Sequence, residues 1–376
     1  MIERDACYFC TSAFQIISII GIAISKNEKA DLYIDPQFFD AKNIAKRLEK
    51  ITIFENIIII DREAIFEKYM SFGPGVLNHL QIANTYFHVN KIAEMILLKD
   101  VVYKRIYLSS KAYLPRMVQL YYISKGIDFN VYYFDDGAGS YDDNRAYKIS
   151  FPDKMLRFLL FGKKSIRIDY ERFLFSEKIY RSLNCNYKGK VFTIDRFWEN
   201  GSNGFTRNWK ESINELFAVQ SDLQIKEKVI ILDQPKDEMF NESDIKCLND
   251  IYDRVVKRVG YDNVIVKKHP RSDAKEFKNI KYFESTGIPF ELYCLNENMS
   301  DKVIISHSST AVATPKVLFN QEPKVIVLTK LMKLITGEKD LFEKYFKAVK
   351  DNYNSPGDFL IPENMEEMNE IIKALI

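Results

Sequence analysis

The chain lacks the sequence signatures of several common nucleotide-dependent enzymes. It contains no G-x-G-x-x-G and no G-x-x-x-x-G-K-[ST], which disfavours a dinucleotide oxidoreductase and a P-loop nucleotidase. No Asp-x-Asp follows an expected strand, so no divalent metal held with a nucleotide diphosphate is predicted. The net charge of +2 over 376 residues gives no overall attraction for nucleic acid. These absences favour a protein that needs neither a cofactor nor a metal.

Long apolar runs and cysteines are also scarce. The most apolar segments, such as Phe14–Ile24 and Ile51–Ile60, are too short to span a bilayer. The first ten residues have no basic segment ahead of a long apolar one, so no signal peptide is expected. The five cysteines are scattered, and no second pair beside Cys7 and Cys10 completes a zinc site, which indicates a reducing compartment. We therefore expect a cytoplasmic protein, free in the cytosol or peripheral on the inner face of the cell membrane.

Strands and helices are expected to alternate along the first half. With 376 residues, 47% hydrophobic and 28% charged, the composition fits a globular protein of two domains. The β-branched run Ile51–Ile60 is typical of a strand buried on both faces. The expected strands are Ala6–Cys10, Asp31–Ile34, Ile51–Ile60, Arg105–Leu108 and Val131–Phe134. The expected helices are a segment ending at Ile24, Ala41–Leu48, Val76–Leu98 and Leu114–Lys125.

A second alternation follows the polar segment Glu199–Asn208, which is the expected linker. Its expected strands are Lys228–Leu232, Val264–Lys267, Val303–Ser306 and Val325–Leu328, with a helix at Asp244–Val259. This order predicts an α/β protein of two Rossmann-like domains with parallel sheets facing across a cleft, residues 1–200 and 201–376. Ligands of such domains bind at the carboxyl ends of the strands.

An acid pair follows the expected strand Val131–Phe134. Asp135 and Asp136 stand directly before Gly137, and a carboxylate at a strand end can take a proton from an acceptor hydroxyl. Adjacent acids face different ways, so one would act as base and the other would brace the loop. The alternative is a plain Asx turn whose acids are solvated or cap the next segment.

A basic cluster follows the expected strand Val264–Lys267. His269 stands between Lys268 and Pro270, where an imidazole can donate a hydrogen bond to a phosphate and protonate it as it leaves. The alternative is a structural histidine at a strand end.

Three hydroxyl residues stand where the strand Val303–Ser306 gives way to an expected helix. Ser308, Ser309 and Thr310 offer hydroxyls and backbone N–H groups that bind phosphate without a metal. The alternative is an ordinary helix N-cap.

Two further segments supply polar side chains. Glu291 follows a Gly-Ile-Pro break and can accept hydrogen bonds from both hydroxyls of a ribose, although a solvent-facing helix acid is the simpler interpretation. Thr11, Ser12 and Gln15 follow the first strand, and in a doubly wound fold that loop lines the ligand site.

The segment Lys154–Lys164 mixes basic with bulky apolar residues. It can lie on an anionic membrane surface and bring the protein to a lipid-linked acceptor. The simpler interpretation is an amphipathic helix packed on its own domain.

These motifs and their order resemble a known family. Asp135–Gly137, His269–Pro270 and Ser308–Ser309 are similar to the motifs of bacterial sialyltransferases with a two-domain GT-B fold. From its TSAFQ segment to SHSST, the chain looks closest to glycosyltransferase family 52, the lipooligosaccharide and capsule sialyltransferase group.

The resemblance implies inverting, metal-independent transfer of sialic acid from CMP-sialic acid to a galactose-terminated oligosaccharide or glycolipid. Asp135 would be the general base, and His269 would contact the CMP phosphate as general acid. Ser308 and Ser309 would hold that phosphate, and Glu291 would bind the cytidine ribose. A homodimer is a further implication of the resemblance.

The other implied site residues form three groups. Further donor-binding residues are Lys268, Pro270 and Thr310. Residues that bind the acceptor or support its loop are Thr11, Ser12, Gln15, Asp136 and Gly137. Rival candidates for the base are Asp233 and Glu242, because some family members place the base nearer the His-Pro motif. The TSAFQ segment departs from closer relatives in having no Pro after its Thr.

Two alternatives share the fold expectation but not the function. One is a GT-B transferase with another donor, such as a CDP-alcohol phosphotransferase or a hexosyltransferase of surface-polymer synthesis. The other is a non-catalytic GT-B-like protein that binds a glycan. Turnover of a nucleotide-linked donor distinguishes the enzymes from the binding protein.

Overall fold

A computed structural model describes residues 2–70, 83–109, 112–141, 150–165, 170–184, 189–194, 209–219, 224–235, 240–269, 280–283, 287–332 and 339–375. The chain divides into two compact units. The first unit comprises Met1–Glu177 and Asn186–Asn200, and the second comprises Lys178–Cys185 and Gly201–Ile376. The structure therefore groups Lys178–Cys185 with the second unit, whereas the sequence-based division keeps residues 1–200 together.

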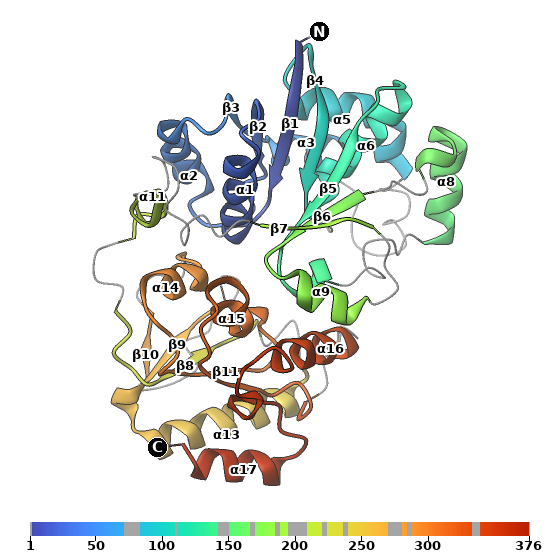
Figure 1. Cartoon of the computed structure of the whole chain (residues 1–376). Helices are drawn as coiled ribbons and strands as arrows, with labels where there is room; N and C mark the ends of the chain where they lie inside the picture. Colours follow the sequence, from blue (N-terminus) through green and yellow to red (C-terminus); the bar gives the residue numbers. More distant parts are fainter. Residues whose placement is uncertain are drawn as a thin grey trace. The chain divides into compact units, whose positions relative to one another are not determined.

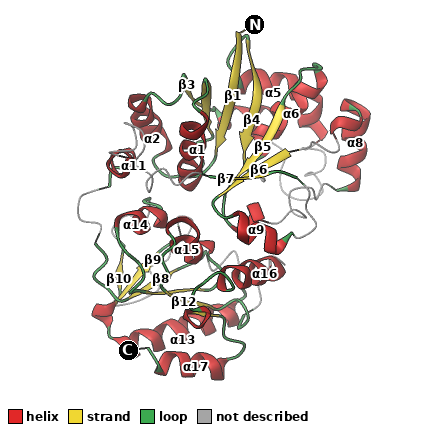
Figure 2. Ribbon diagram, viewed as in Figure 1, coloured by secondary structure: helices red, strands yellow, loops and turns green. Residues whose placement is uncertain are grey.

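The first unit is built on a seven-stranded parallel sheet of order β3-β2-β1-β4-β5-β6-β7, with helices on both of its faces (Figures 1 and 2). Its strands are β1 (Ile2–Cys10), β2 (Ala30–Ile34), β3 (Asn56–Ile59), β4 (Val101–Leu108), β5 (Asn130–Phe134), β6 (Tyr170–Leu174) and β7 (Val191–Thr193). Its helices are α1 (Ala13–Lys26), α2 (Ala41–Leu48), η1 (Glu49–Ile51), α3 (Arg62–Tyr69), residues 83–87, α5 (Val89–Ile96), α6 (Tyr113–Ser124), η2 (Ala138–Tyr141), α8 (Phe151–Phe161) and η3 (Lys163–Ser165).

The second unit is built on a six-stranded parallel sheet of order β10-β9-β8-β11-β12-β13. Its strands are β8 (Val229–Leu232), β9 (Val264–Lys267), β10 (Lys281–Tyr282), β11 (Val303–Ser306), β12 (Lys324–Val327) and β13 (Phe359–Leu360). Its helices are α9 (Glu177–Leu183, in this unit from Lys178), α11 (Trp209–Leu216), α13 (Glu242–Val259), η5 (Tyr261–Asn263), α14 (Phe290–Asn296), η6 (Thr310–Ala313), α15 (Thr314–Phe319), α16 (Lys339–Lys350), η7 (Pro356–Asp358) and α17 (Met365–Lys373).

Both sheets have the same doubly wound strand order, which reverses beside the first strand of each unit. The reversal lies between β1 and β4 in the first sheet and between β8 and β11 in the second. The central strands are apolar and buried along their length, as in the VIIL of β8 and the VIIS of β11, because helices cover both faces. The prediction of two Rossmann-like domains with parallel sheets is confirmed. In such sheets ligands bind at the carboxyl ends beside the reversal, which directs attention to the residues that follow these strands.

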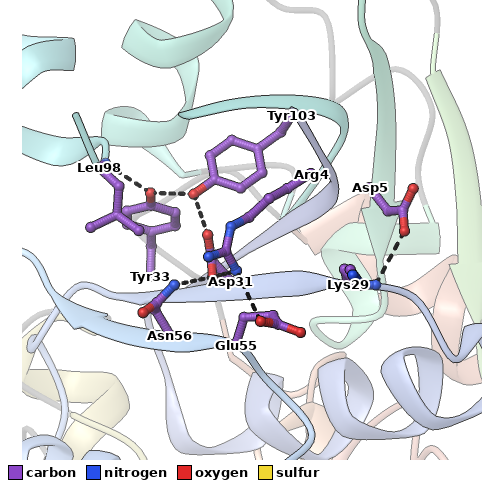
Figure 3. Close-up of polar contacts among 9 residues, drawn as sticks. All are labelled: Arg4, Asp5, Lys29, Asp31, Tyr33, Glu55, Asn56, Leu98 and Tyr103. Carbon is purple, nitrogen blue, oxygen red and sulfur yellow. Dashed lines mark hydrogen bonds and ion pairs between the residues drawn. The ribbon is translucent and has the colours of Figure 1, made fainter. Parts of the chain in front are cut away.

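A buried polar network ties together the other end of the first sheet (Figure 3). Asp31 of β2 is fully buried and accepts hydrogen bonds from Arg4 at 2.8 Å, Asn56 at 2.8 Å and the Tyr103 hydroxyl at 2.6 Å. The Tyr103 hydroxyl also contacts that of Tyr33 at 2.7 Å. The network joins four adjacent strands around a carboxylate that is fully buried, so it supports their register.

The elements depart from the sequence-based expectations mainly at the sheet edges. Ile51–Ile60 was expected to be one strand buried on both faces, but Ile51 ends η1 and only Asn56–Ile59 forms β3. That expectation is wrong because β3 is an edge strand, paired on one side with β2 and partly exposed. The short strands β6, β7, β10 and β13 were not anticipated, and the part of the expected helix Val76–Leu98 before residue 83 lies outside the described residues.

Candidate active site residues in the two units

The acid pair of the first unit follows β5, and its first member is locked into the loop. Asp135 accepts hydrogen bonds from the Gly137 N–H at 3.0 Å and from the Phe175 N–H at 3.1 Å. It also accepts one from the Tyr141 hydroxyl at 2.5 Å. The bond from Gly137 is the Asx turn considered above, and the φ of +85° at Gly137 requires the left-handed conformation that glycine adopts freely. Asp135 is not solvated, however, because only 2% of it is exposed.

The loop after the acid pair is held from β6. Arg172 is fully buried, and its guanidinium donates to the Ser140 carbonyl and to the Tyr170 hydroxyl at 3.0 Å. The Ser140 hydroxyl in turn accepts a hydrogen bond from the Asp136 N–H at 2.8 Å. Asp136 itself is half-buried, so the two acids differ clearly in their access to solvent.

Burial raises the pKa of Asp135 to about 6, although the hydrogen bonds from Tyr141, Phe175 and Gly137 and the nearby Arg172 guanidinium oppose the shift. A carboxylate titrating near 6 is ionised at neutral pH and is still basic enough to take a proton from a hydroxyl. Its two oxygens can accept about four hydrogen bonds, and three are occupied. Asp135 therefore holds the loop through most of its acceptor capacity.

The segment after β1 is organised by its own side chains. Ser12 is the N-cap of α1, and its hydroxyl accepts from the Gln15 N–H at 3.3 Å. The Gln15 side chain is buried and accepts from the Thr11 N–H at 2.7 Å. These contacts explain why Thr11, Ser12 and Gln15 occur together, and they give the three residues a role in shaping the loop.

In the second unit, Lys267 at the end of β9 is the most unusual charged residue. It is 8% exposed, and its Nζ has no hydrogen-bond partner in the described part of the chain. The Nζ lies 5.5 Å from the ring centroid of Phe283 and 5.6 Å from that of Tyr293, two rings that meet edge to face at 4.5 Å. Burial lowers the pKa of Lys267 to about 8, while the Glu291 carboxylate acts in the opposite direction.

Glu291 belongs to the same cluster. It lies in the first turn of α14, is buried, and accepts a hydrogen bond from the Thr314 hydroxyl at 3.4 Å. Burial raises the pKa of Glu291, and the nearby Lys267 ammonium partly offsets the increase. The interpretation of Glu291 as a solvent-facing helix acid is therefore wrong, because the helix turns this acid inward.

The hydroxyl turn follows β11. Ser308 is buried, and its Oγ has no hydrogen-bond partner among the residues that the structure describes. Ser309 precedes η6 but makes no capping bond with its side chain, and Thr310 begins η6 half-buried. The ordinary N-cap interpretation does not account for these residues, and a buried hydroxyl without a partner is a group that a ligand oxygen can satisfy.

The remaining candidates of the second unit follow β8 or β9 in the chain, or begin α13. His269 is half-buried two residues beyond β9, and the Nζ of Lys268 lies 5.1 Å from the Tyr282 ring centroid. Pro270 lies outside the described residues. Of the rival bases, Asp233 is buried after β8 and its N–H donates to the Lys267 carbonyl at 2.9 Å. Glu242 is exposed at the start of α13.

Tyr141, Arg172 and Lys267 become candidate site residues only through the structure. Tyr141 carries a weak signal, since it lies six residues beyond Asp135, but nothing in the sequence pairs Arg172 with that loop. Lys267 was noticed only as part of a basic cluster. Its burial depends on Phe283 and Tyr293, which approach it only in the folded unit.

Comparisons with known proteins identify the fold. No protein-family model matches the chain, and a search of curated proteins gives no match. Among solved structures, it is similar to UDP-GlcNAc 2-epimerase from Methanocaldococcus jannaschii in complex with UDP-GlcNAc and UDP, with 14% identity over 100% of this chain and 99% of that one and a TM-score of 0.50. The chain has a GT-B fold. The calicheamicin glycosyltransferase CalG4 is similar at 10% identity over 100% of this chain and 91% of that one, also with a TM-score of 0.50. At these identities the likeness establishes the GT-B fold alone, and membership of the sialyltransferase family stays a prediction.

Proposed function

We propose that this GT-B protein is a glycosyltransferase that moves sialic acid from CMP-sialic acid to a galactose-type hydroxyl of a surface glycan, by inversion and without a metal. The observation that carries the proposal is the cluster at the carboxyl edge of the second sheet. There Lys267 ends β9, Glu291 lies in the first turn of α14, and Ser308 follows β11. All three are buried, and neither the Lys267 Nζ nor the Ser308 Oγ has a hydrogen-bond partner among the described residues. Such groups cost stability unless a ligand satisfies them.

The nucleotide supplies partners for this set. Ribose hydroxyls donate hydrogen bonds, and Glu291 is the carboxylate that accepts them. Phosphate oxygens accept hydrogen bonds, and the hydroxyls of Ser308 and Ser309 would donate them, followed in the chain by Thr310. Lys268, after β9, would add a second positive charge for the donor. Lys267 adds a positive charge between two aromatic rings, where a nucleotide oxygen can accept from its Nζ. His269 then contacts the phosphate and returns a proton to it as the sugar departs.

On the acceptor side the proposed base is Asp135. Its raised pKa suits proton transfer, and Asp136 with Gly137 completes the Asx turn that fixes its position. Thr11, Ser12 and Gln15 shape the neighbouring loop after β1. Asp136 is a competing base because this residue is less buried than Asp135, and Asp233 and Glu242 remain the rival candidates of the second unit.

The deciding experiment measures CMP release from CMP-sialic acid with a galactose-terminated acceptor, with and without EDTA. We expect release that resists EDTA and falls at least ~100-fold in His269→Ala, the usual scale for loss of an acid–base group. His88→Ala is the matched control, because His88 is a half-buried histidine of the first unit whose Nδ1 contacts the Asn84 carbonyl at 2.9 Å. Release that stops with EDTA contradicts the metal-free mechanism. No release from CMP-sialic acid, but turnover of a CDP- or UDP-linked donor, contradicts the donor assignment while retaining the transferase.

A second comparison assigns the base. Asp135→Asn is expected to lower kcat/KM by at least ~100-fold and to remove the rise of activity with pH that ends near 6. Asp136→Asn is expected to retain that pH profile. Loss of activity confined to Asp136→Asn would transfer the role to Asp136.

A further inference from the structure

Helix α8 carries an apolar face that nothing in the described part of the chain covers. Among the described residues, eleven large hydrophobic side chains are exposed, and five of them lie on this one eleven-residue helix. They are Phe151, Met155, Phe158, Leu159 and Leu160. Scattered exposed apolar residues need no explanation, but a concentration on one element marks an interaction surface.

The opposite face of α8 is already used to hold the helix in place. Arg157 is buried and donates from Nε to the Tyr86 hydroxyl at 2.8 Å, and that hydroxyl donates to Asp153 at 3.1 Å. Phe161 meets the Tyr86 ring edge to face at a centroid distance of 6.1 Å. Asp153, Arg157 and Phe161 are spaced four apart, so they share one side of the helix. The exposed set at Phe151, Met155 and positions 158–159 lies on the other side.

The exposed side is flanked by positive charge. Lys154, Lys163 and Lys164 are all exposed, the last two in η3 directly after α8. The acid of the segment, Asp153, is turned inward to Tyr86. Large apolar side chains rimmed by lysines match an anionic lipid surface, where the apolar groups enter the acyl boundary and the ammonium groups meet the headgroups.

A second copy of the chain fits this face less well. A two-fold pairing through α8 would bring the same lysine set of both copies to one interface, where like charges repel. No helix in the described residues is long and apolar enough to cross a membrane, and α8 with its eleven residues is suited to lying on the surface instead.

We propose that α8 and η3 form a peripheral membrane-binding surface for anionic lipid bilayers. Figure 1 shows α8 in green, beside the sheet of the first unit. The side of the helix that contacts Tyr86 would anchor it to that unit, and the other side would enter the lipid. The interpretation of Lys154–Lys164 as a helix packed on its own domain then holds for one side of the helix only. The proposal does not depend on which donor or acceptor the protein uses.

The test is co-flotation of the full chain with vesicles of phosphatidylglycerol and phosphatidylcholine, compared with vesicles of phosphatidylcholine alone. We expect binding to the anionic vesicles that weakens as salt is raised from 0.05 to 0.5 M. Phe151→Glu should weaken it at least tenfold. Lys163→Gln with Lys164→Gln should weaken it about 25-fold, since each lysine near an anionic surface contributes about fivefold.

The matched control is Phe39→Glu. Phe39 lies in the same unit and is 66% exposed, close to the 74% of Phe151, but it is not on α8. Equal loss of binding in both phenylalanine variants, or no binding of the wild type to anionic vesicles, overturns the proposal. A third outcome also overturns the proposal: the wild type forms a dimer, Phe151→Glu dissociates it, and vesicles bind neither the wild type nor the variant. That result would assign the apolar face of α8 to a second copy of the chain. Thermal melts of the variants establish that each is folded.

Discussion

At the scale of single residues, the most informative feature is that the two buried ionisable groups Asp135 and Lys267 have opposite pKa shifts and different hydrogen bonding. Burial raises the pKa of Asp135 to about 6, whereas burial lowers that of Lys267 to about 8. Asp135 has three hydrogen-bond donors around it, but the Lys267 Nζ has no acceptor in the described chain. The first is thus a satisfied group with a tuned proton affinity, and the second is a charge that gains by binding a ligand.

Asp135 should make the protein less stable as pH rises through the acid range. Its pKa of about 6 lies above the unfolded value, so the folded state binds the proton more tightly. Its contribution to the free energy of unfolding therefore falls between about pH 4 and 6, by about 3 kcal/mol in total. Asp135→Asn should lack this component. Urea unfolding of both proteins at pH 4 and pH 7 measures it, and an equal pH dependence in the two proteins would contradict it.

Lys267 should make nucleotide binding depend on pH at the alkaline end. Its ammonium is lost above about pH 8 in the free protein. A bound nucleotide oxygen would hold the proton, so affinity for CMP should fall about tenfold per pH unit between about 8 and 10. Calorimetric titration should show proton uptake on binding in that range. Lys267→Met should bind weakly with a flat profile, while Lys268→Met should keep the slope. A sloped profile in Lys267→Met would assign the titration to another group.

At the scale of elements, the first sheet depends on the polar network around Asp31 (Figure 3). Tyr103→Phe removes the hydroxyl that donates to Asp31 at 2.6 Å and contacts Tyr33. Because a buried hydrogen bond to a charged group is lost, the free energy of unfolding should fall by about 2 kcal/mol. Tyr132→Phe is the control on β5, since Tyr132 is half-buried, and it should cost less than about 0.5 kcal/mol. Chemical denaturation measures both, and equal effects would show that the network adds nothing.

The sequence predicted the central strands of each sheet but missed β6 and the edge strands β7, β10 and β13. Val264–Lys267 and Val303–Ser306 form strands with the predicted bounds, because short β-branched runs followed by polar residues mark a buried strand and its end. The two-residue strands β10 and β13 are too short to leave a pattern. Ile51–Ile60 shows the opposite error, because a long buried strand was predicted where only the short edge strand β3 forms. An edge strand can be as rich in isoleucine as a central one.

The candidate site was predictable only where residue type and strand end coincide. Asp135, His269 and Ser308 follow strands, and that position made them candidates. Lys267 and Arg172 were not candidates, because what makes them unusual is burial against partners distant in sequence. Local pattern therefore located the carboxyl edges of the sheets, while the electrostatics of those edges needed the folded units.

At the scale of the whole molecule, two parallel sheets with separate hydrophobic cores imply two unfolding units. The proposed nucleotide residues all belong to the second unit, and the Asp31 network belongs to the first. Calorimetry of the full chain should therefore show a transition that CMP raises and another that Tyr103→Phe lowers. At 100 times its dissociation constant, CMP should stabilise the second unit by about 2.7 kcal/mol, a shift of about 5 to 10 °C.

The same calorimetry separates this division from its alternative. If the units unfold independently, Tyr103→Phe leaves the CMP-sensitive transition in place, and Lys267→Met removes the shift by CMP without affecting the other transition. If CMP and Tyr103→Phe both shift one common transition, independent unfolding is contradicted. A perturbation confined to one core would then change the stability of the whole chain. CMP could instead raise the melting temperature of the same transition that Tyr103→Phe lowers and leave the second transition unchanged. That result would place the nucleotide in the first unit and overturn the assignment of Lys267, Glu291 and Ser308 to the donor.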